Sequence, residues 1–250
     1  MSLLAGDPLR QLVDLPGVSD AVESARDALA EVHRHPTNRR GWPATSAEAS
    51  VRAARASAAI DGASPELPED GQVDDPRLAG ALRVAESLGL LLTTWERAPL
   101  QALARLHVLA AADLVHEREA DALGRPQLNE DGTARLDLLA KVVTTTKVPG
   151  PVLYAVVHGE LLTLRPFGTA DGVIARAAGR LVAIGTGLDP RGLGVPEVSY
   201  LRRPHEYASA ADAFATGTAD GVAGWISYCC KALEAGAKEA TSIADAASPS

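Results

Sequence analysis

Apolar side chains recur at intervals of three and four residues along most of the chain, which is the spacing of helices that bury one face or more. The segment from Val18 to Val32 shows the pattern most clearly. The same spacing predicts helices over residues 18–32, 46–60, 77–92, 99–117, 136–146, 150–164 and 172–185, and an Ala-rich helix in the last part of the chain. Residues 1–19 and 191–207 are expected to be extended, loop or short helix.

Polar and turn-forming residues mark where these helices begin and end. Thr45 precedes Glu48 by three residues, which is the pattern of a capping box at the start of a helix. An acidic, Pro-rich loop is expected over residues 64–76. Within residues 124–135, the pair Asp131 and Gly132 is typical of a hairpin turn and predicts one small β-hairpin.

The expected fold is therefore mainly all-α, a helical bundle with one hairpin. A core of Ala, Leu and Val favours helices over sheets, since only 4% of the residues are aromatic. We expect an N-terminal extension and helix over residues 1–45, a helical domain over 46–240, and a disordered tail over 241–250.

Charge and cysteine content exclude several classes of protein. The net charge of −8 disfavours nucleic-acid binding, which needs a basic face. No apolar run is long enough to cross a membrane. Cys229 and Cys230 are adjacent, which strains a disulfide and does not fit a zinc site, so buried thiols in a cytoplasmic protein are expected. The oligomeric state is not indicated.

The stretch LTLRPFGTADGVIARAAGRLV, residues 162–182, carries the candidate chemistry. A short loop with an arginine at its entrance joins two apolar helical patterns and leads into the second through Gly172. The N-terminus of a helix presents free N–H groups and partial positive charge, which bind phosphate well. The loop is either an anion site or a plain connector.

The order of residues in this loop resembles the motif of the Fic/Doc (Fido) family, His-Pro-Phe-x-Asp/Glu-Gly-Asn-Gly-Arg-x-x-Arg. Aligned without gaps, the matching residues are Pro166, Phe167, Gly172 and Arg176. The departures are Arg165 for histidine, Thr169 for the acid, Ala170 for glycine, Asp171 for asparagine and Val173 for the first arginine.

The surroundings add to the resemblance. The segment AVVHGELLTL, which contains His158, is similar to the family's preceding helix, although a histidine on an apolar helix is more often part of the core. The segment SAAIDG is similar to the family's inhibitory motif, with Ser57, Asp61 and Gly62 in place and Asp61 replacing glutamate. Residues 124–135 lie where the family has a flap that docks the target protein.

The resemblance implies AMP transfer from ATP, with Mg²⁺, to a hydroxyl of a target protein. It places Arg165, Thr169 and Asp171 at catalytic positions, and assigns phosphate binding to Phe167, Gly168, Gly172 and Arg176. A guanidinium cannot accept a proton, so Arg165 cannot act as the base that histidine provides. Thr169 is neutral and a poor ligand for Mg²⁺, so no metal ligand is predicted.

Three hypotheses follow from these residues. The first is a Fic-like protein with a degenerate loop that binds a nucleotide or phosphate weakly, or regulates a partner, without efficient AMP transfer. The second keeps nucleotidyl or phosphoryl transfer by other groups around Thr169, Asp171 and Arg176. The third is an interaction module whose hairpin at 124–135 pairs with a target strand.

The resemblance also predicts an ion pair between Asp61 and Arg176. The pair is either purely structural or a latch that blocks the nucleotide. A third role for Asp61, as a base towards water in the removal of AMP, would still need a metal.

Overall fold

The computed structural model describes residues 6–64 and 71–248, and every regular element in those ranges is helical, which confirms an all-α chain. The elements are α1 (Arg10–Val13), α2 (Val18–Arg34), α3 (Pro36–Ile60), α4 (Pro76–Arg97), α5 (Pro99–Ala111), a 3₁₀ helix η1 (Glu117–Ala122), α6 (Glu130–Thr145), α7 (Gly150–Leu164), α8 (Asp171–Gly185), α9 (Pro196–Arg202), α10 (Pro204–Ala215) and α11 (Ala219–Ala246).

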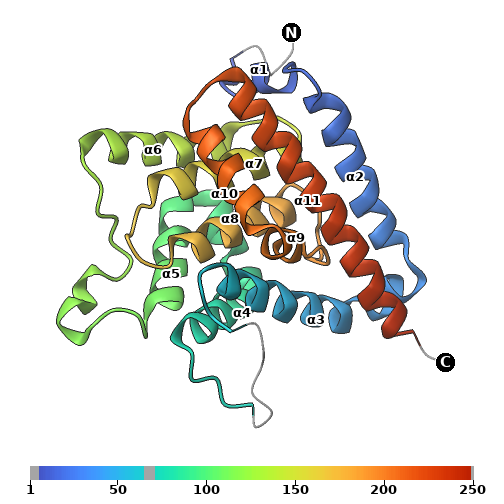
Figure 1. The fold of residues 1–250 in the computed structure, drawn as a ribbon, viewed down its shortest axis with the longest axis horizontal. Helices are drawn as coiled ribbons and strands as arrows, with labels where there is room; N and C mark the ends of the chain where they lie inside the picture. Colours follow the sequence, from blue (N-terminus) through green and yellow to red (C-terminus); the bar gives the residue numbers. More distant parts are fainter. Residues whose placement is uncertain (1–5, 65–70, 249–250) are drawn as a thin grey trace.

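Helices α7 and α8 form the centre of the molecule (Figure 1). Ten of the 15 residues of α7 and twelve of the 15 residues of α8 are buried. A helix that is buried on nearly every side must be surrounded by others. Helices α4 and α5 pack against α8, and α10 and α11 pack against α7. The loop between α7 and α8 is therefore held within the bundle at both ends.

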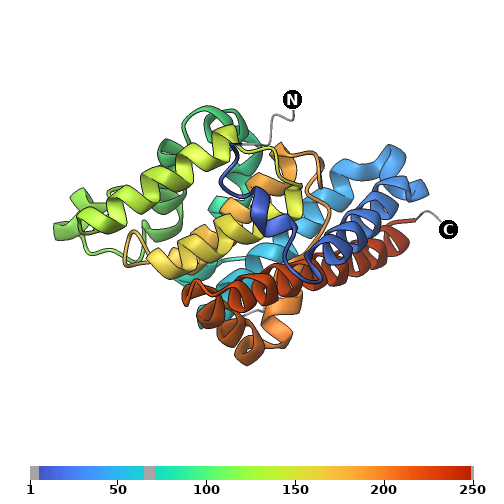
Figure 2. The same cartoon turned by 90° about the horizontal axis from the view of Figure 1, so that it is seen from above.

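Helix α2 lies along the long helix α11, as Figure 2 shows. The buried side chains of α2 are Val18, Val22, Ala25, Leu29 and Val32. Their spacing of three and four residues is the one that predicted this helix, because such positions share one face. This pair of helices covers one side of the central bundle, away from the loop that follows α7.

Close packing joins α7 to the helices around it at Gly159. A Cβ atom at Gly159 would lie 2.7 Å from both the ring of Phe214 and Nε1 of Trp225. The same Nε1 donates a hydrogen bond of 2.7 Å to the carbonyl oxygen of Ala155. Only glycine permits this approach, which fixes α10 and α11 on the face of α7 that lies behind the loop.

The helix expected to begin at residue 46 begins at Pro36, so the predicted capping box at Thr45 and Glu48 is wrong. Thr45 is buried, and its hydroxyl donates to Oδ1 of Asn38 at 2.7 Å. Pro36 occupies the first turn, where its missing N–H costs nothing. Pro43 lies inside the helix without ending it, since side-chain bonds such as that of Thr45 hold the turn around it.

The predicted hairpin in residues 124–135 is also wrong, because α6 begins at Glu130. Oδ1 of Asn129 accepts the N–H of Gly132 at 2.8 Å and so caps the helix. Glu130 and Asp131 lie in the first turn, where negative charge is favourable. Asp131 and Gly132 therefore open a helix instead of closing a turn between strands.

Three smaller differences concern the ends of segments. Helix α11 continues to Ala246, so most of the tail expected to be disordered is helical. Helix α5 ends at Ala111, several residues earlier than expected. Part of the acidic loop expected over 64–76 lies outside the described residues. No helix in the described ranges is both long enough and apolar enough to cross a bilayer.

Candidate functional site

The loop between α7 and α8 contains three residues with positive φ angles. These are Arg165 (φ 46°), Gly168 (φ 76°) and Ala170 (φ 54°). The left-handed conformation costs a residue with a side chain about 1–2 kcal/mol. Ala170 pays this cost at the position where the motif has glycine, which is physical support for the ungapped alignment. Both Arg165 and Ala170 therefore depend on surrounding contacts to keep their conformations.

Phe167 anchors the loop in the core. Its side chain is buried and stacks on the ring of His107, with 4.3 Å between the ring centroids and 14° between the planes. The preceding carbonyl, that of Pro166, accepts the N–H of Gln127 at 2.7 Å. The segment before α6 is thus attached directly to the loop. Phe167 acts as an anchor of the loop and does not line the cavity described below.

His107 holds the hydroxyl of Thr169 in place. The N–H of Gly124 donates to Nδ1 of His107 at 2.9 Å, so the ring proton is on Nε2. Nε2 then donates to the hydroxyl oxygen of Thr169 at 3.0 Å. Burial lowers the pKa of His107 to about 4, which keeps this neutral tautomer at physiological pH. Sequence analysis did not single out His107, because nothing in its neighbourhood in the chain relates it to the loop.

Asp171 closes the loop onto itself. Its side chain is buried, and Oδ1 accepts the N–H of Phe167 at 3.0 Å. Oδ2 is covered and has no hydrogen-bond partner among the described residues. Burial raises the pKa of Asp171, although the N–H groups of Phe167 and Gly168 and the charge of Arg165 counteract the shift.

Arg176 is buried beneath the loop and makes the predicted contact with Asp61. Its Nη2 atom lies 2.8 Å from Oδ2 of Asp61 and donates to the carbonyl oxygen of Ser57 at 2.9 Å, while Nε donates to the hydroxyl of Ser57 at 2.7 Å. Burial alone would lower the pKa of Arg176, but Asp61 and Tyr207 outweigh it and raise this pKa. Arg176 is thus charged and fully engaged.

Gly62 explains how Asp61 is aimed at this arginine. It has φ 93°, and its N–H donates to the carbonyl of Ala59, while the N–H of Ala63 donates to the carbonyl of Ala58. These two bonds form a Schellman motif, which ends α3 at Asp61 and favours glycine at the next position. The chain reverses there and leaves the carboxylate directed at α8.

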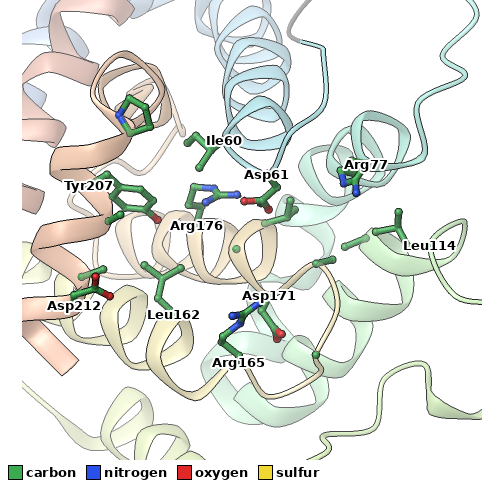
Figure 3. A pocket seen from close by; sticks show the side chains of 18 residues that line it. Ile60, Asp61, Arg77, Leu114, Leu162, Arg165, Asp171, Arg176, Tyr207 and Asp212 are labelled. Carbon is green, nitrogen blue, oxygen red and sulfur yellow. Dashed lines mark ion pairs between the residues drawn. The ribbon is translucent and has the colours of Figure 1, made fainter. Parts of the chain in front are cut away.

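A cavity of about 570 Å³ lies beside the loop and contains charges of both signs. Figure 3 shows Asp61 between Arg176 and Arg77, with Arg165 and Asp171 below them. The lining residues that carry charge are Asp61, Arg77, Arg165, Asp171, Arg176 and Asp212. The loop over residues 165–172 therefore borders a concave site.

Part of this lining was predicted from the sequence. Arg165, Gly168, Asp171, Gly172 and Arg176 line the cavity as expected. Thr169 does not appear in the lining. Arg77, Tyr207 and Asp212 were missed, because no motif in the chain marks them.

His158 lies behind the site in the core, as expected. It is fully buried, and its Nε2 is 2.7 Å from the hydroxyl of Tyr207. Burial, with the charge of Arg176 added, places the pKa of His158 well below its ordinary value. A neutral histidine under Arg176 supports the site without reaching the cavity.

This arrangement of helices is similar to that of solved structures of Fic proteins. A Fic family protein from Desulfovibrio desulfuricans G20 superposes with a TM-score of 0.68 at 20% identity, over 91% of this chain and 74% of that one. Residues 134–508 of Fic-1 from C. elegans superpose with a TM-score of 0.69 at 17% identity, over 92% of this chain and 74% of that one. The chain has the Fic fold. No protein-family model and no curated protein sequence matches it.

Both superpositions cover nearly the whole of this chain, but sequence identities of 20% and 17% show the fold alone and do not carry over an activity. The function therefore depends on the residues at the cavity of this protein.

Proposed function

We propose that this Fic-fold protein binds a phosphate-bearing ligand, with a nucleotide as the first candidate, in the cavity beside residues 165–172 and does not transfer AMP efficiently. The observation that carries the proposal is the identity and place of Arg165. This residue borders the cavity at the position of the motif's histidine, and its side chain is exposed to solvent. A guanidinium stays protonated at physiological pH and holds anions well, but it cannot accept a proton.

The second part of the proposal is that Asp61 competes with the ligand. Its carboxylate lies against the first turn of α8, where a Cβ atom on Gly172 would be 2.7 Å from Oδ1 and 2.8 Å from Oδ2. A helix N-terminus is where a phosphate group binds most readily. Asp61 thus supplies an internal anion at that place and neutralises Arg176 as well. A ligand must displace it or bind beside it.

A second candidate function is nucleotidyl transfer with Asp171 as the proton acceptor. Its raised pKa favours this role, since a base that titrates nearer neutrality is more effective. Its Oδ2 atom, however, is buried, so the loop would have to open before a hydroxyl reached it. The hypothesis of an interaction module that pairs a hairpin with a target strand is not supported, because no hairpin forms at residues 124–135. Binding of a partner protein at these residues stays a prediction.

Two measurements test the proposal. Incubation with ATP labelled on its α-phosphate and Mg²⁺ should leave the protein unlabelled and add no label to a cell lysate beyond that in lysate alone, and strong added labelling would favour the second candidate. Thermal unfolding with ATP, ADP or phosphate should show stabilisation, which reaches about 2.7 kcal/mol at 100 times the dissociation constant. If millimolar concentrations of all three ligands leave the melting temperature of wild type and of Asp61→Ala unchanged, the binding proposal is wrong.

A further inference from the structure

The oxygen atoms of the loop do not fit the divalent metal that the motif implies. Mg²⁺ is bound through carboxylates and phosphate oxygens in near-ideal octahedral geometry. Thr169 stands at the position of the motif's acid, is neutral, and accepts the Nε2 proton of His107. It is also absent from the lining of the cavity. Thr169 therefore lacks the charge of the acid in the motif, and its hydroxyl contacts His107 instead of lining the cavity.

The neighbouring carboxylates do not replace it. Oδ1 of Asp171 accepts the N–H of Phe167, and Oδ2 is covered. Asp61 is paired with Arg176. Asp212 is exposed, but it lies on α10, across the cavity from Arg77 in Figure 3. Within the described ranges no group of three or more His, Cys, Asp or Glu residues is arranged to hold a metal ion.

Two guanidinium groups are free to act in its place. Arg77 in the first turn of α4 and Arg165 at the start of the loop both line the cavity and are exposed. Neither side chain makes a hydrogen bond or an ion pair with any part of the chain that the structure describes. The carboxylate beside Arg77, that of Asp75, is used to cap α4 through the N–H groups of Arg77 and Leu78. Neither positive charge is therefore held in an ion pair within the described residues, although the charge of Arg165 acts on the nearby Asp171 and counteracts the rise in its pKa.

We propose that Arg77 and Arg165 together replace a divalent cation as the countercharge of the ligand, and that the site takes a free diphosphate group in place of a metal complex. This inference rests on the proposed function and adds Arg77 as a ligand-contacting residue. A guanidinium binds phosphate oxygens through paired N–H groups and a full positive charge. A bound Mg²⁺ ion would occupy those oxygens and cancel much of the charge that the two arginines recognise.

The test is calorimetric titration of the full chain, wild type and Asp61→Ala, with ADP and with inorganic pyrophosphate. Each titration is done once in buffer with EDTA and once with Mg²⁺ in excess over the ligand. We expect binding in EDTA and weaker binding in Mg²⁺. Binding that requires Mg²⁺ overturns this inference and leaves the proposed function intact. No binding by either protein in either buffer overturns both.

Substitutions assign the effect to the two arginines. Arg77→Gln and Arg165→Gln should each weaken ADP binding in EDTA about tenfold, the loss expected for one charge-assisted hydrogen bond. The control is Arg97→Gln, which removes an exposed arginine from the last turn of the same helix, away from the cavity. It should bind like wild type. Unchanged affinity in Arg77→Gln, or an equal loss in Arg97→Gln, overturns the inference.

Discussion

The carboxylate of Asp61 lies directly against the backbone of Gly172, the second residue of α8. A methyl group on Gly172 would be 2.7 Å from Oδ1 of Asp61 and 3.1 Å from Nη2 of Arg176. Two residues far apart in the chain thus share one small volume at the N-terminus of a buried helix. This contact connects the end of α3 to the start of α8.

Substitution of Asp61 by alanine should raise the affinity for ADP and lower stability moderately. Ser57 still satisfies part of the guanidinium of Arg176, and the side chain of Asp61 is 28% exposed. The expected loss is therefore about 1–3 kcal/mol, the range for one hydrogen bond to a charged group. Urea unfolding and calorimetric titration measure the two effects. A larger loss of stability without a gain in affinity would indicate a purely structural pair.

Substitution of Gly172 by alanine should destabilise the wild-type protein but not Asp61→Ala. In wild type the new methyl group would collide with the carboxylate, whereas in the variant that space is free. There alanine should be neutral or stabilising by up to about 1 kcal/mol, because it fits a helix better than glycine. A double-mutant cycle by urea unfolding gives the coupling. Additive effects would mean that the two residues are not in contact.

Substitution of Ser57 by alanine should cost about 1–3 kcal/mol, because it leaves Nε of the buried Arg176 without its acceptor. The matched control is Ser50→Ala on the same helix, where the serine side chain makes no hydrogen bond with the residues that the structure describes, and its stability should change by less than about 0.5 kcal/mol. Equal losses in the two variants would show that the serine makes no specific contribution to holding the arginine.

Stability should fall as the pH is lowered from about 6.5 to about 4, in part because of His107. Burial lowers its pKa in the folded protein to about 4 from an ordinary 6.5, so the unfolded chain binds more protons throughout this interval. His107→Gln keeps an acceptor and a donor at this position but cannot titrate. Its free energy of unfolding should therefore depend less on pH than that of wild type.

The contribution of His158 to the pH dependence should remain in that variant, because burial also holds the pKa of His158 well below its ordinary value. Denaturant unfolding at a series of pH values, for wild type and His107→Gln side by side, isolates the difference. Identical slopes would contradict the assignment of a neutral His107 in the folded state.

Restoring a base and an acid to the loop should create measurable AMP transfer. In an Asp61→Ala background, Arg165→His with Thr169→Asp should label with ATP and Mg²⁺ about 10²–10⁴ times faster than Arg165→Gln with Thr169→Asp, the usual contribution of a positioned base. Equal labelling by the two variants would show that position 165 cannot present a base to the cavity.

Much of the fold could be read from local patterns, because burial of a continuous helical face imposes a period on the sequence. The buried face of α2 and the positions of α7 and α8 follow from that period. The errors occurred where a local pattern serves two structures. Asp131 and Gly132 suit a tight turn, but with Asn129 before them they also suit a helix N-terminus, and the cap formed.

The residues of the candidate site could also be predicted only in part from the sequence. The resemblance of the loop to the Fic motif indicated Arg165, Asp171, Gly172 and Arg176, and the resemblance of residues 57–62 to the inhibitory motif indicated the partner for Arg176. Arg77 could not be found in this way, because its role depends on where the first turn of α4 lies relative to the loop. The residues next to Arg77 in the sequence do not distinguish it from the other arginines, so its place at the cavity could not be predicted.

The pentapeptide GTADG occurs twice, at residues 168–172 and 217–221. Comparison of the two copies shows what the sequence determined and what the tertiary structure decided. At residues 217–221 the hydroxyl of Thr218 accepts the N–H of Gly221, and the helix begins immediately after this threonine. At residues 168–172 the hydroxyl of Thr169 is bound by His107, Ala170 takes a left-handed conformation, and the helix begins one residue later. The five residues by themselves specified a glycine turn leading into a helix. At residues 168–172 the helix start was decided by the tertiary contact with His107 of α5, because the threonine hydroxyl is oriented towards that ring and no side chain caps the start of the helix.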